Sequence, residues 1–290
     1  MRFHRSLLWI LVFAWLGLAG LVRAEDNGAK RVIQQFTSIF ENSTPELQYG
    51  YVENIKDGRG FTFGMAGFCS GTYDGTEFLK EYQRLKPDNA LVKFIPVFER
   101  IDAGPHDADG KSADTHGLEA FPKAFAGCAG DPVFRQAQQN VADRMYWTPS
   151  QDKAREIGAK YAITRGELYD AYINHGDDQV ADMIKKVNRT LHGTPQSGVD
   201  EKKWLAEFLK VRLAVLKADP TWSEAVDRIA VYQKLLADGN VDPHCAGGGE
   251  VILEWRRTQG WQRFSAAESR SRVGSTQEWP FGPYSSPYRF

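Results

Sequence analysis

The chain has 290 residues, of which 42% are hydrophobic, 25% charged and 12% aromatic. This is the composition of a globular protein, and it is too apolar and aromatic for a disordered one. The formal net charge of −1 leaves no basic surplus, so the composition does not suggest nucleic acid or an anionic membrane as a partner.

Residues 1–24 have the features of a secretory signal peptide. Two arginines precede an apolar run, and Val22 and Ala24 stand where a signal peptidase reads the chain. The run is shorter than the roughly 20 residues of a spanning helix, which favours cleavage before Glu25 over retention as an anchor. We therefore expect an exported protein, secreted or periplasmic, that is not held in a membrane after cleavage.

The mature chain begins with an expected helix over residues 30–41, where apolar residues recur at helical spacing. Residues 58–75 are rich in glycine, aromatic residues and threonine, which predicts the short strands of a small antiparallel sheet. Helical patterns return after Thr76. Residues 102–118 carry aspartates around a glycine but lack the closing glutamate of a calcium loop, so we expect a surface loop and no metal site.

The C-terminal half is predicted to be strongly helical. It begins with Asp131 as a helix N-cap and Pro132 in the first turn, and one of the later helices is expected to end at Gly176. Residues 265–290 show no period. We expect one domain over residues 25–260, and a tail over residues 261–290 that is not an independent domain.

The three cysteines divide into two kinds. Cys69 lies in an apolar stretch and is expected in the core, whereas Cys128 and Cys245 lie in glycine-rich segments. Because export permits disulfides, we expect Cys128 and Cys245 to pair. No C-x-x-C motif is present, which argues against thiol redox chemistry and a cysteine zinc site.

Common catalytic motifs are absent from the sequence. It has no G-x-S-x-G elbow, no phosphate-binding glycine loop and no pair of histidines at helical spacing around a glutamate. What remains is a set of carboxylates: Glu41 at a helix end, Asp57 in a glycine-rich turn and Asp74 in G-T-Y-D-G. Such acids are also common as ordinary turn and helix-end residues, so the spacing alone leaves both interpretations open.

Longer segments carry a family resemblance. S-I-F-E-N-S-T, followed by Y-V-E-N-I-K-D-G-R-G-F-T-F-G-M-A-G-F-C-S-G-T-Y-D, resembles the catalytic segment of the chitosanases of glycoside hydrolase family 46. The resemblance continues through L-Y-D-A-Y-I-N-H-G and F-L-K-V-R, so it covers most of residues 30–242. It implies a mainly α (α+β), two-lobed, lysozyme-like fold with a small antiparallel sheet beside the cleft. The implied activity is endo-acting hydrolysis of β-1,4 links in chitosan with inversion.

The resemblance also implies roles for single residues. Glu41 matches the general acid, Asp57 the base that activates water and Thr62 the hydroxyl that holds this water. Arg59 matches an arginine beside the base, and Asp74 a carboxylate that receives a glucosamine ammonium.

A second set of matching residues lies farther along the chain. Asp170, Arg212 and Arg228 match an interior ion network that supports the acid from behind, although Asp170 and Arg212 also fit an ordinary buried pair. Tyr51 is a candidate for stacking on a sugar or for the core of the small lobe. We expect a monomer that needs no cofactor.

General chemistry fits this assignment. An inverting glycosidase needs two carboxyls roughly 6.5 to 9.5 Å apart, one protonated and one ionised. Burial of Glu41 among apolar residues favours its protonated form, and exposure of Asp57 favours its ionised form. Two alternatives remain: a lysozyme-like hydrolase of peptidoglycan or chitin, and a non-catalytic glycan-binding protein.

Overall fold

The computed structural model describes residues 28–40, 44, 46–218 and 225–242, together with the backbone of residues 253–257 and 260–264. Four expectations fall on residues outside this part of the chain. They are the signal peptide of residues 1–24, the general acid Glu41, the cysteine Cys245 and the tail beyond residue 264.

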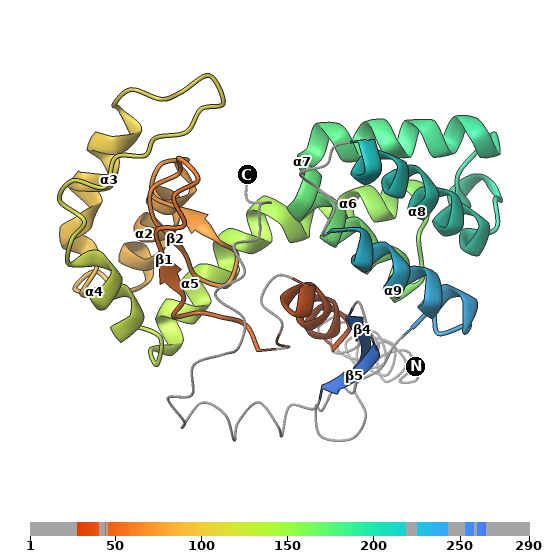
Figure 1. The fold of residues 1–290 in the computed structure, drawn as a ribbon, viewed down its shortest axis with the longest axis horizontal. Coiled ribbons are helices and arrows are strands. Elements are labelled where there is room, and N and C mark those ends of the chain that lie inside the picture. The colour runs from red at the N-terminus through yellow and green to blue at the C-terminus, as the bar shows by residue number, and fades with distance from the viewer. Residues whose placement is uncertain are drawn as a thin grey trace, which may run out of the picture.

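The described chain is mainly helical and forms two lobes, which lie at opposite ends of the view in Figure 1. The small lobe, residues 46–142, contains β1 (Val52–Glu53), β2 (Thr62–Phe63), β3 (Phe68–Cys69), α2 (Asp74–Leu85), η1 (Val92–Phe94), α3 (Ile95–Asp102), α4 (Phe121–Gly127) and α5 (Pro132–Ala142). The large lobe, residues 143–242, contains η2 (Asp143–Trp147), α6 (Thr148–Ile157), α7 (Ala162–Leu191), η3 (Pro195–Ser197), α8 (Glu201–Ala218) and α9 (Val226–Ala237). The mainly α (α+β) class is confirmed.

The sheet of the small lobe is antiparallel, in the order β1-β2-β3. Phe63 on the central strand pairs with Val52 on one side and with Phe68 on the other. The sequence predicted the two later strands and missed β1, because a strand of two residues is too short to show alternation. These short strands serve mainly to hold the turns between them.

An aromatic cluster stabilises the small lobe around Phe63, which is fully buried. Its ring meets those of Phe121 and Phe125 edge-on, with centroids 5.0 and 4.9 Å apart. Edge-to-face pairs of this kind add to the free energy gained from burial alone. The sheet is therefore fixed firmly against α4, and its turns have a rigid base.

In the large lobe, α7 runs through a kink at Gly176, where φ is 71° and ψ is 176°. The sequence predicted that a helix ends at this glycine, and this is confirmed, because the non-helical angles of Gly176 separate the two helical segments that together make up α7. At the other end of the helical half, Asp131 caps α5 as predicted, because its side chain accepts a hydrogen bond from Val133 N.

Two segments join the lobes. The π-helical η2 continues α5 into α6, and the helix of residues 28–40 packs against both lobes (Figure 1). Lys30 Nζ of this helix lies 2.6 Å from Asp143 Oδ2 on η2. Its apolar side chains contribute Ile33 to the small-lobe core, while Phe36 packs with Leu235 of α9.

A second antiparallel ribbon, β4 (Leu253–Arg257) with β5 (Gly260–Phe264), was not expected from the sequence. The boundary at residue 261 therefore falls inside β5. Residues 102–118 form a surface loop, and no cluster of potential metal ligands occurs among the residues that the structure describes. Within the same residues, no helix has the length and apolar character needed to cross a membrane.

Candidate active site

Asp57 lies in the tight turn between β1 and β2. Three residues of this turn, Lys56, Gly58 and Gly60, have positive φ angles of 62°, 87° and 72°. A side chain at Gly60 would bring its Cβ to 2.2 Å from Ser70 Oγ, so only glycine fits there. The glycine-rich sequence is thus what places Asp57 at the tip of the turn, where it is exposed to solvent.

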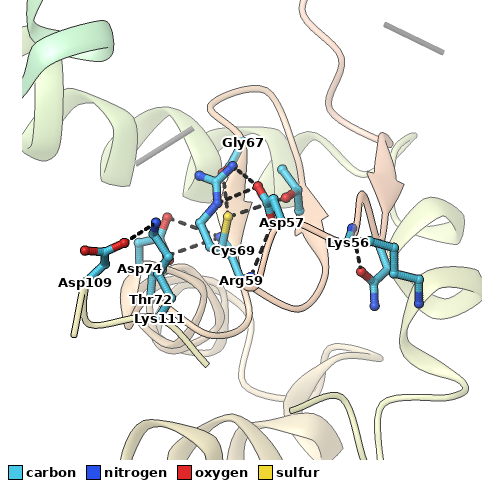
Figure 2. A network of polar contacts seen from close by, with 11 residues as sticks. Lys56, Asp57, Arg59, Gly67, Cys69, Thr72, Asp74, Asp109 and Lys111 are labelled. Atoms are coloured by element: carbon cyan, nitrogen blue, oxygen red, sulfur yellow. Dashed lines mark hydrogen bonds and ion pairs between the residues drawn. The ribbon is translucent and has the colours of Figure 1, made fainter. Parts of the chain in front are cut away.

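The carboxylate of Asp57 is held by Arg59 (Figure 2). Arg59 Nε donates to Asp57 Oδ2 at 2.7 Å, Nη2 donates to the same oxygen, and Arg59 N donates to Oδ1 at 3.2 Å. Arg59 is almost completely buried, so its side chain is fixed by its surroundings. The guanidinium therefore holds the carboxylate in one orientation.

Thr62 is buried on β2, and its Oγ1 lies 3.5 Å from Sγ of Cys69 on β3. Burial and the nearby Asp74 carboxylate raise the pKa of Cys69 to about 11, so this thiol stays protonated. Cys69 is therefore a core residue, as the sequence predicts, and it is unsuited to act as a nucleophile.

Asp74 begins α2, and its carboxylate lies beside Cys69 (Figure 2). Oδ1 accepts hydrogen bonds from Thr72 Oγ1 at 2.7 Å, Gly75 N at 3.0 Å and Cys69 N at 3.1 Å, while Oδ2 accepts from Cys69 N at 3.2 Å. Burial raises the pKa of Asp74 to about 6. Oδ2 keeps most of its acceptor capacity, which leaves room for one further donor.

Tyr146 lies on η2 and is a neighbour of Asp74 and Cys69. The sequence analysis did not single it out. Burial, together with the neighbouring Asp74 and Cys69, raises the pKa of Tyr146 well above its ordinary value, and Arg59 opposes this shift. Its hydroxyl therefore keeps its proton beside the Asp74 carboxylate. A π-helical turn is common at functional sites, but the sequence carries no sign of one here.

Tyr51 precedes β1 and is partly buried. Its hydroxyl donates to Glu53 Oε2 at 3.1 Å. The two residues lie on the same side of the strand because side chains alternate along it. Tyr51 therefore contacts a carboxylate that the sequence analysis did not name.

The large lobe brings Asp170, Arg212 and Arg228 together in its interior. Arg212 Nη2 lies 2.8 Å from Asp170 Oδ2, and Arg228 Nη1 lies 2.9 Å from Asp170 Oδ1. Burial alone would raise the pKa of Asp170, but the two guanidinium groups outweigh it and hold the pKa below its ordinary value. Asp170 is therefore an ionised bridge between the two arginines.

Glu167 belongs to the same network and was missed by the sequence analysis. It lies one helical turn before Asp170 on α7, and its Oε1 is 2.8 Å from Arg212 Nη1. Burial raises the pKa of Glu167 to about 7. Burial and the positive charge of Arg212 also lower the pKa of His175 to about 3, so this histidine stays neutral. Residues three apart in a helix lie on the same face. The two acids at i and i+3 in the sequence are therefore the signal that both can reach one partner.

The network reaches the helix that precedes Glu41. The guanidinium of Arg228 lies over the ring of Phe40, 5.5 Å from its centroid, and Phe40 also contacts the ring of Tyr232. Glu41 follows Phe40 directly in the chain but lies outside the described residues. The distance between the Glu41 and Asp57 carboxyls therefore stays a prediction.

Cys128 is buried at the end of α4, and its thiol donates to Ala124 O at 3.3 Å. The structure gives it as a free thiol. Because Cys245 lies outside the described residues, the disulfide between the two also stays a prediction.

Comparison with known proteins places this arrangement in a family. A curated chitosanase from Bacillus subtilis strain 168 is 38% identical over 247 residues, which are 81% of this chain and 87% of that protein. A curated chitosanase from Streptomyces sp. strain N174 is 34% identical and covers 75% of this chain and 77% of its own length.

Solved structures show the same relationship. A chitosanase from Gynuella sunshinyii in complex with chitotetraose is 38% identical, has a TM-score of 0.68, and covers 82% of this chain and 97% of its own. The native chitosanase from Bacillus subtilis MY002 is 36% identical, has a TM-score of 0.69, and covers 82% and 98%. The fold is thus the lysozyme-like one that the resemblance implied. The model of glycosyl hydrolase family 46 matches residues 35–245, and the chain belongs to this family.

Proposed function

We propose that this protein is an exported, endo-acting chitosanase that hydrolyses the β-1,4 links of chitosan with inversion. The observation that carries the proposal is the partly exposed Asp57 carboxylate, fixed by Arg59 on a glycine-rich turn, in a chain whose relatives are named chitosanases. The partner is the polysaccharide, and no cofactor is required.

In the proposed reaction Glu41 protonates the oxygen of the leaving sugar, and Asp57 removes a proton from a water molecule that attacks the anomeric carbon from the opposite face. Thr62 helps to hold this water. Support comes from the elements that carry these residues: Asp57 lies on the small lobe, whereas Glu41 follows a helix that contacts both lobes.

The ion network serves the acid in this mechanism. After each cycle Glu41 is ionised, and a positive charge behind it stabilises this state until a proton returns. Arg228 suits this role because it contacts Phe40 with its guanidinium face and Asp170 with Nη1. Asp170 and Arg212 fix Arg228 in turn.

Substrate choice is assigned to Asp74. A carboxylate with one oxygen largely free attracts the ammonium of glucosamine, whereas an N-acetyl group carries no charge and leaves the carboxylate without its partner. This preference distinguishes chitosan from chitin and peptidoglycan. The hydrogen-bonded pair of Tyr51 and Glu53 is assigned to contacts with a neighbouring sugar.

The test is hydrolysis of fully deacetylated chitosan by the mature protein, with the first product anomer followed by NMR. We expect the α-anomer from β-links, because inversion reverses the configuration. An initial β-anomer indicates retention and refutes the mechanism. Hydrolysis of chitin or peptidoglycan with no action on chitosan supports the lysozyme-like alternative, and binding without hydrolysis supports a non-catalytic glycan-binding protein.

Export is tested separately. Expression of the full chain in a bacterial host, followed by N-terminal sequencing of the exported protein, is expected to give a mature chain that starts at Glu25. Size-exclusion chromatography of that protein is expected to show a monomer.

A further inference from the structure

Tyr73 is an exposed aromatic residue next to the candidate site. Half of its side chain is accessible, and among the described residues only Val215 joins it as an exposed large hydrophobic side chain. Tyr73 directly precedes Asp74, whose carboxylate points back to Cys69 and Gly75. The partly exposed ring is thus placed beside a carboxylate that is held by the backbone of Cys69 and Gly75.

The backbone at Tyr73 is strained. Its φ of 69° is unfavourable for a residue with a side chain, and ψ is −32°. Asp74 N donates to Thr72 O at 2.9 Å across this residue, which makes Tyr73 the centre of a γ-turn. A glycine would adopt this turn at lower cost, so a tyrosine there lowers the stability of the fold.

The Tyr73 ring stacks on His106. The two rings lie 4.8 Å apart at an angle of 11°, and the imidazole Nδ1 donates to Gly104 O at 3.0 Å. One face of the tyrosine is therefore covered by a ring that is itself hydrogen-bonded to its loop. Half of the surface of Tyr73 stays accessible, as is expected of an aromatic residue that is covered on one face only.

The loop that carries His106 is fixed against the same turn. Ser112 N donates to Gly71 O at 2.9 Å, and a Cβ at Gly71 would approach Ser112 O to 1.9 Å, so the two backbones are in direct contact. Asp107 and Asp109 are exposed on this loop, and Lys111 offsets one of their charges. The surroundings of the stacked pair are rigid and slightly acidic.

We propose that the accessible face of Tyr73 binds a sugar ring of the chitosan chain, next to the sugar whose ammonium pairs with Asp74. The inference rests on the proposed function and extends it by one binding position. An aromatic face offers apolar contact to the C–H face of a sugar and attracts a nearby ammonium group, and the acidic loop favours the same cation. The strained turn then has a function, because it presents the ring outward while Asp74 stays anchored.

The test is Tyr73→Gly, assayed with glucosamine oligomers from trimer to hexamer and with polymeric chitosan. As the oligomers become longer, the wild-type kcat/KM should rise at the length at which a sugar first contacts Tyr73. The variant should lose this gain, by about threefold to tenfold and mainly through KM. Its Tm should be at least as high as that of the wild type, because glycine relieves the turn, so the loss is not explained by unfolding.

Two further variants complete the design. Tyr73→Phe keeps the ring and should keep the gain, and Val215→Ala removes an exposed apolar side chain on α8 as a matched control. The proposal is overturned if Tyr73→Gly retains the gain, if it lowers kcat/KM equally at every length, or if Tyr73→Phe behaves like glycine. A wild-type protein that does not cleave chitosan at all refutes the proposed function instead.

Discussion

In the interior of the large lobe, Oε1 of Glu167 lies 2.8 Å from Nη1 of Arg212, and both side chains are fully buried. Such a contact places two ionisable groups away from water. Its net contribution to stability depends on pH, because the charge of Glu167 does. Glu167 has a pKa of about 7, whereas Asp170 on the same arginine stays ionised. The buried ion network that contacts Phe40 therefore changes its net charge near neutral pH, because Glu167 loses its proton there.

The first prediction concerns Glu167→Gln. Burial raises the folded-state pKa of Glu167 above its unfolded value, so its contribution to stability is full at low pH and is lost as the pH rises through about 7. Glutamine does not titrate. The free energy of unfolding of the variant, relative to wild type, should therefore increase between pH 5 and pH 8 in urea titrations. Glu156→Gln on α6, an exposed position, is the control. A difference that stays constant with pH contradicts the assignment.

The second prediction is that Glu41→Gln and Asp57→Asn each lower kcat by roughly 10² or more, because each removes a proton transfer. Circular dichroism should match the wild type for Asp57→Asn, because asparagine keeps the shape of the side chain and an oxygen that accepts from the buried Arg59. A folded Glu41→Gln protein with near-normal activity would falsify its role as the acid.

The third prediction concerns the orientation of the base. Arg59→Lys keeps a positive charge but loses the two-nitrogen contact with Asp57 Oδ2. We expect kcat to fall by about 10- to 100-fold while the product anomer stays the same, because the carboxylate is misplaced but still present. Arg135→Lys on α5, an exposed position, is a suitable control. An unchanged kcat would show that Asp57 needs no such support.

The fourth prediction is the pH dependence of substrate binding through Asp74. Its pKa of about 6 means that the ionised fraction falls as the pH drops below this value, and with it the attraction for ammonium. The ratio of KM for Asp74→Asn to KM for wild type should therefore be largest above pH 6 and should shrink toward pH 5. The ion pair also needs the protonated amine of the substrate, so the ratio should fall again at the higher pH at which glucosamine loses its positive charge. Equal losses on deacetylated and partly acetylated chitosan would make Asp74 a structural residue.

The fifth prediction is the disulfide between Cys128 and Cys245. The bridge closes a loop of more than 100 residues, for which chain entropy gives about 5 kcal/mol of stabilisation. The mass of the unreduced, exported protein should be lower by two hydrogens than that of the reduced protein, and a peptide linking the two cysteines should appear after digestion. Three free thiols, or a bridge to Cys69, would overturn the pairing.

Much of the fold was predictable because its signals are local. The cap at Asp131 depends on a residue and its next two neighbours, and the break at Gly176 on the freedom of glycine. The β1 strand and the π-helical turn of η2 were not predictable. Both depend on contacts made across the fold, and neither has a repeating pattern long enough to recognise.

The candidate site was predictable to a similar degree. Glycines and the family resemblance pointed to Asp57, Arg59 and Asp74, which the structure brings together around Cys69. Glu167 and Tyr146 were missed because their importance lies in what surrounds them. Burial shifts the properties of both, and burial of a polar residue is visible only when the chain is folded.

The contact between Gly71 and Ser112 limits how this enzyme can be altered. No side chain can be accommodated at Gly71, and the loop of residues 102–118 is held at Ser112 against the turn that follows β3. Sequence changes and insertions at the tip around Gly110, which has open space around it, leave this attachment intact. The tip is thus a position where loops of different length or charge can be grafted to change oligomer preference, while the hydrolytic centre is left undisturbed.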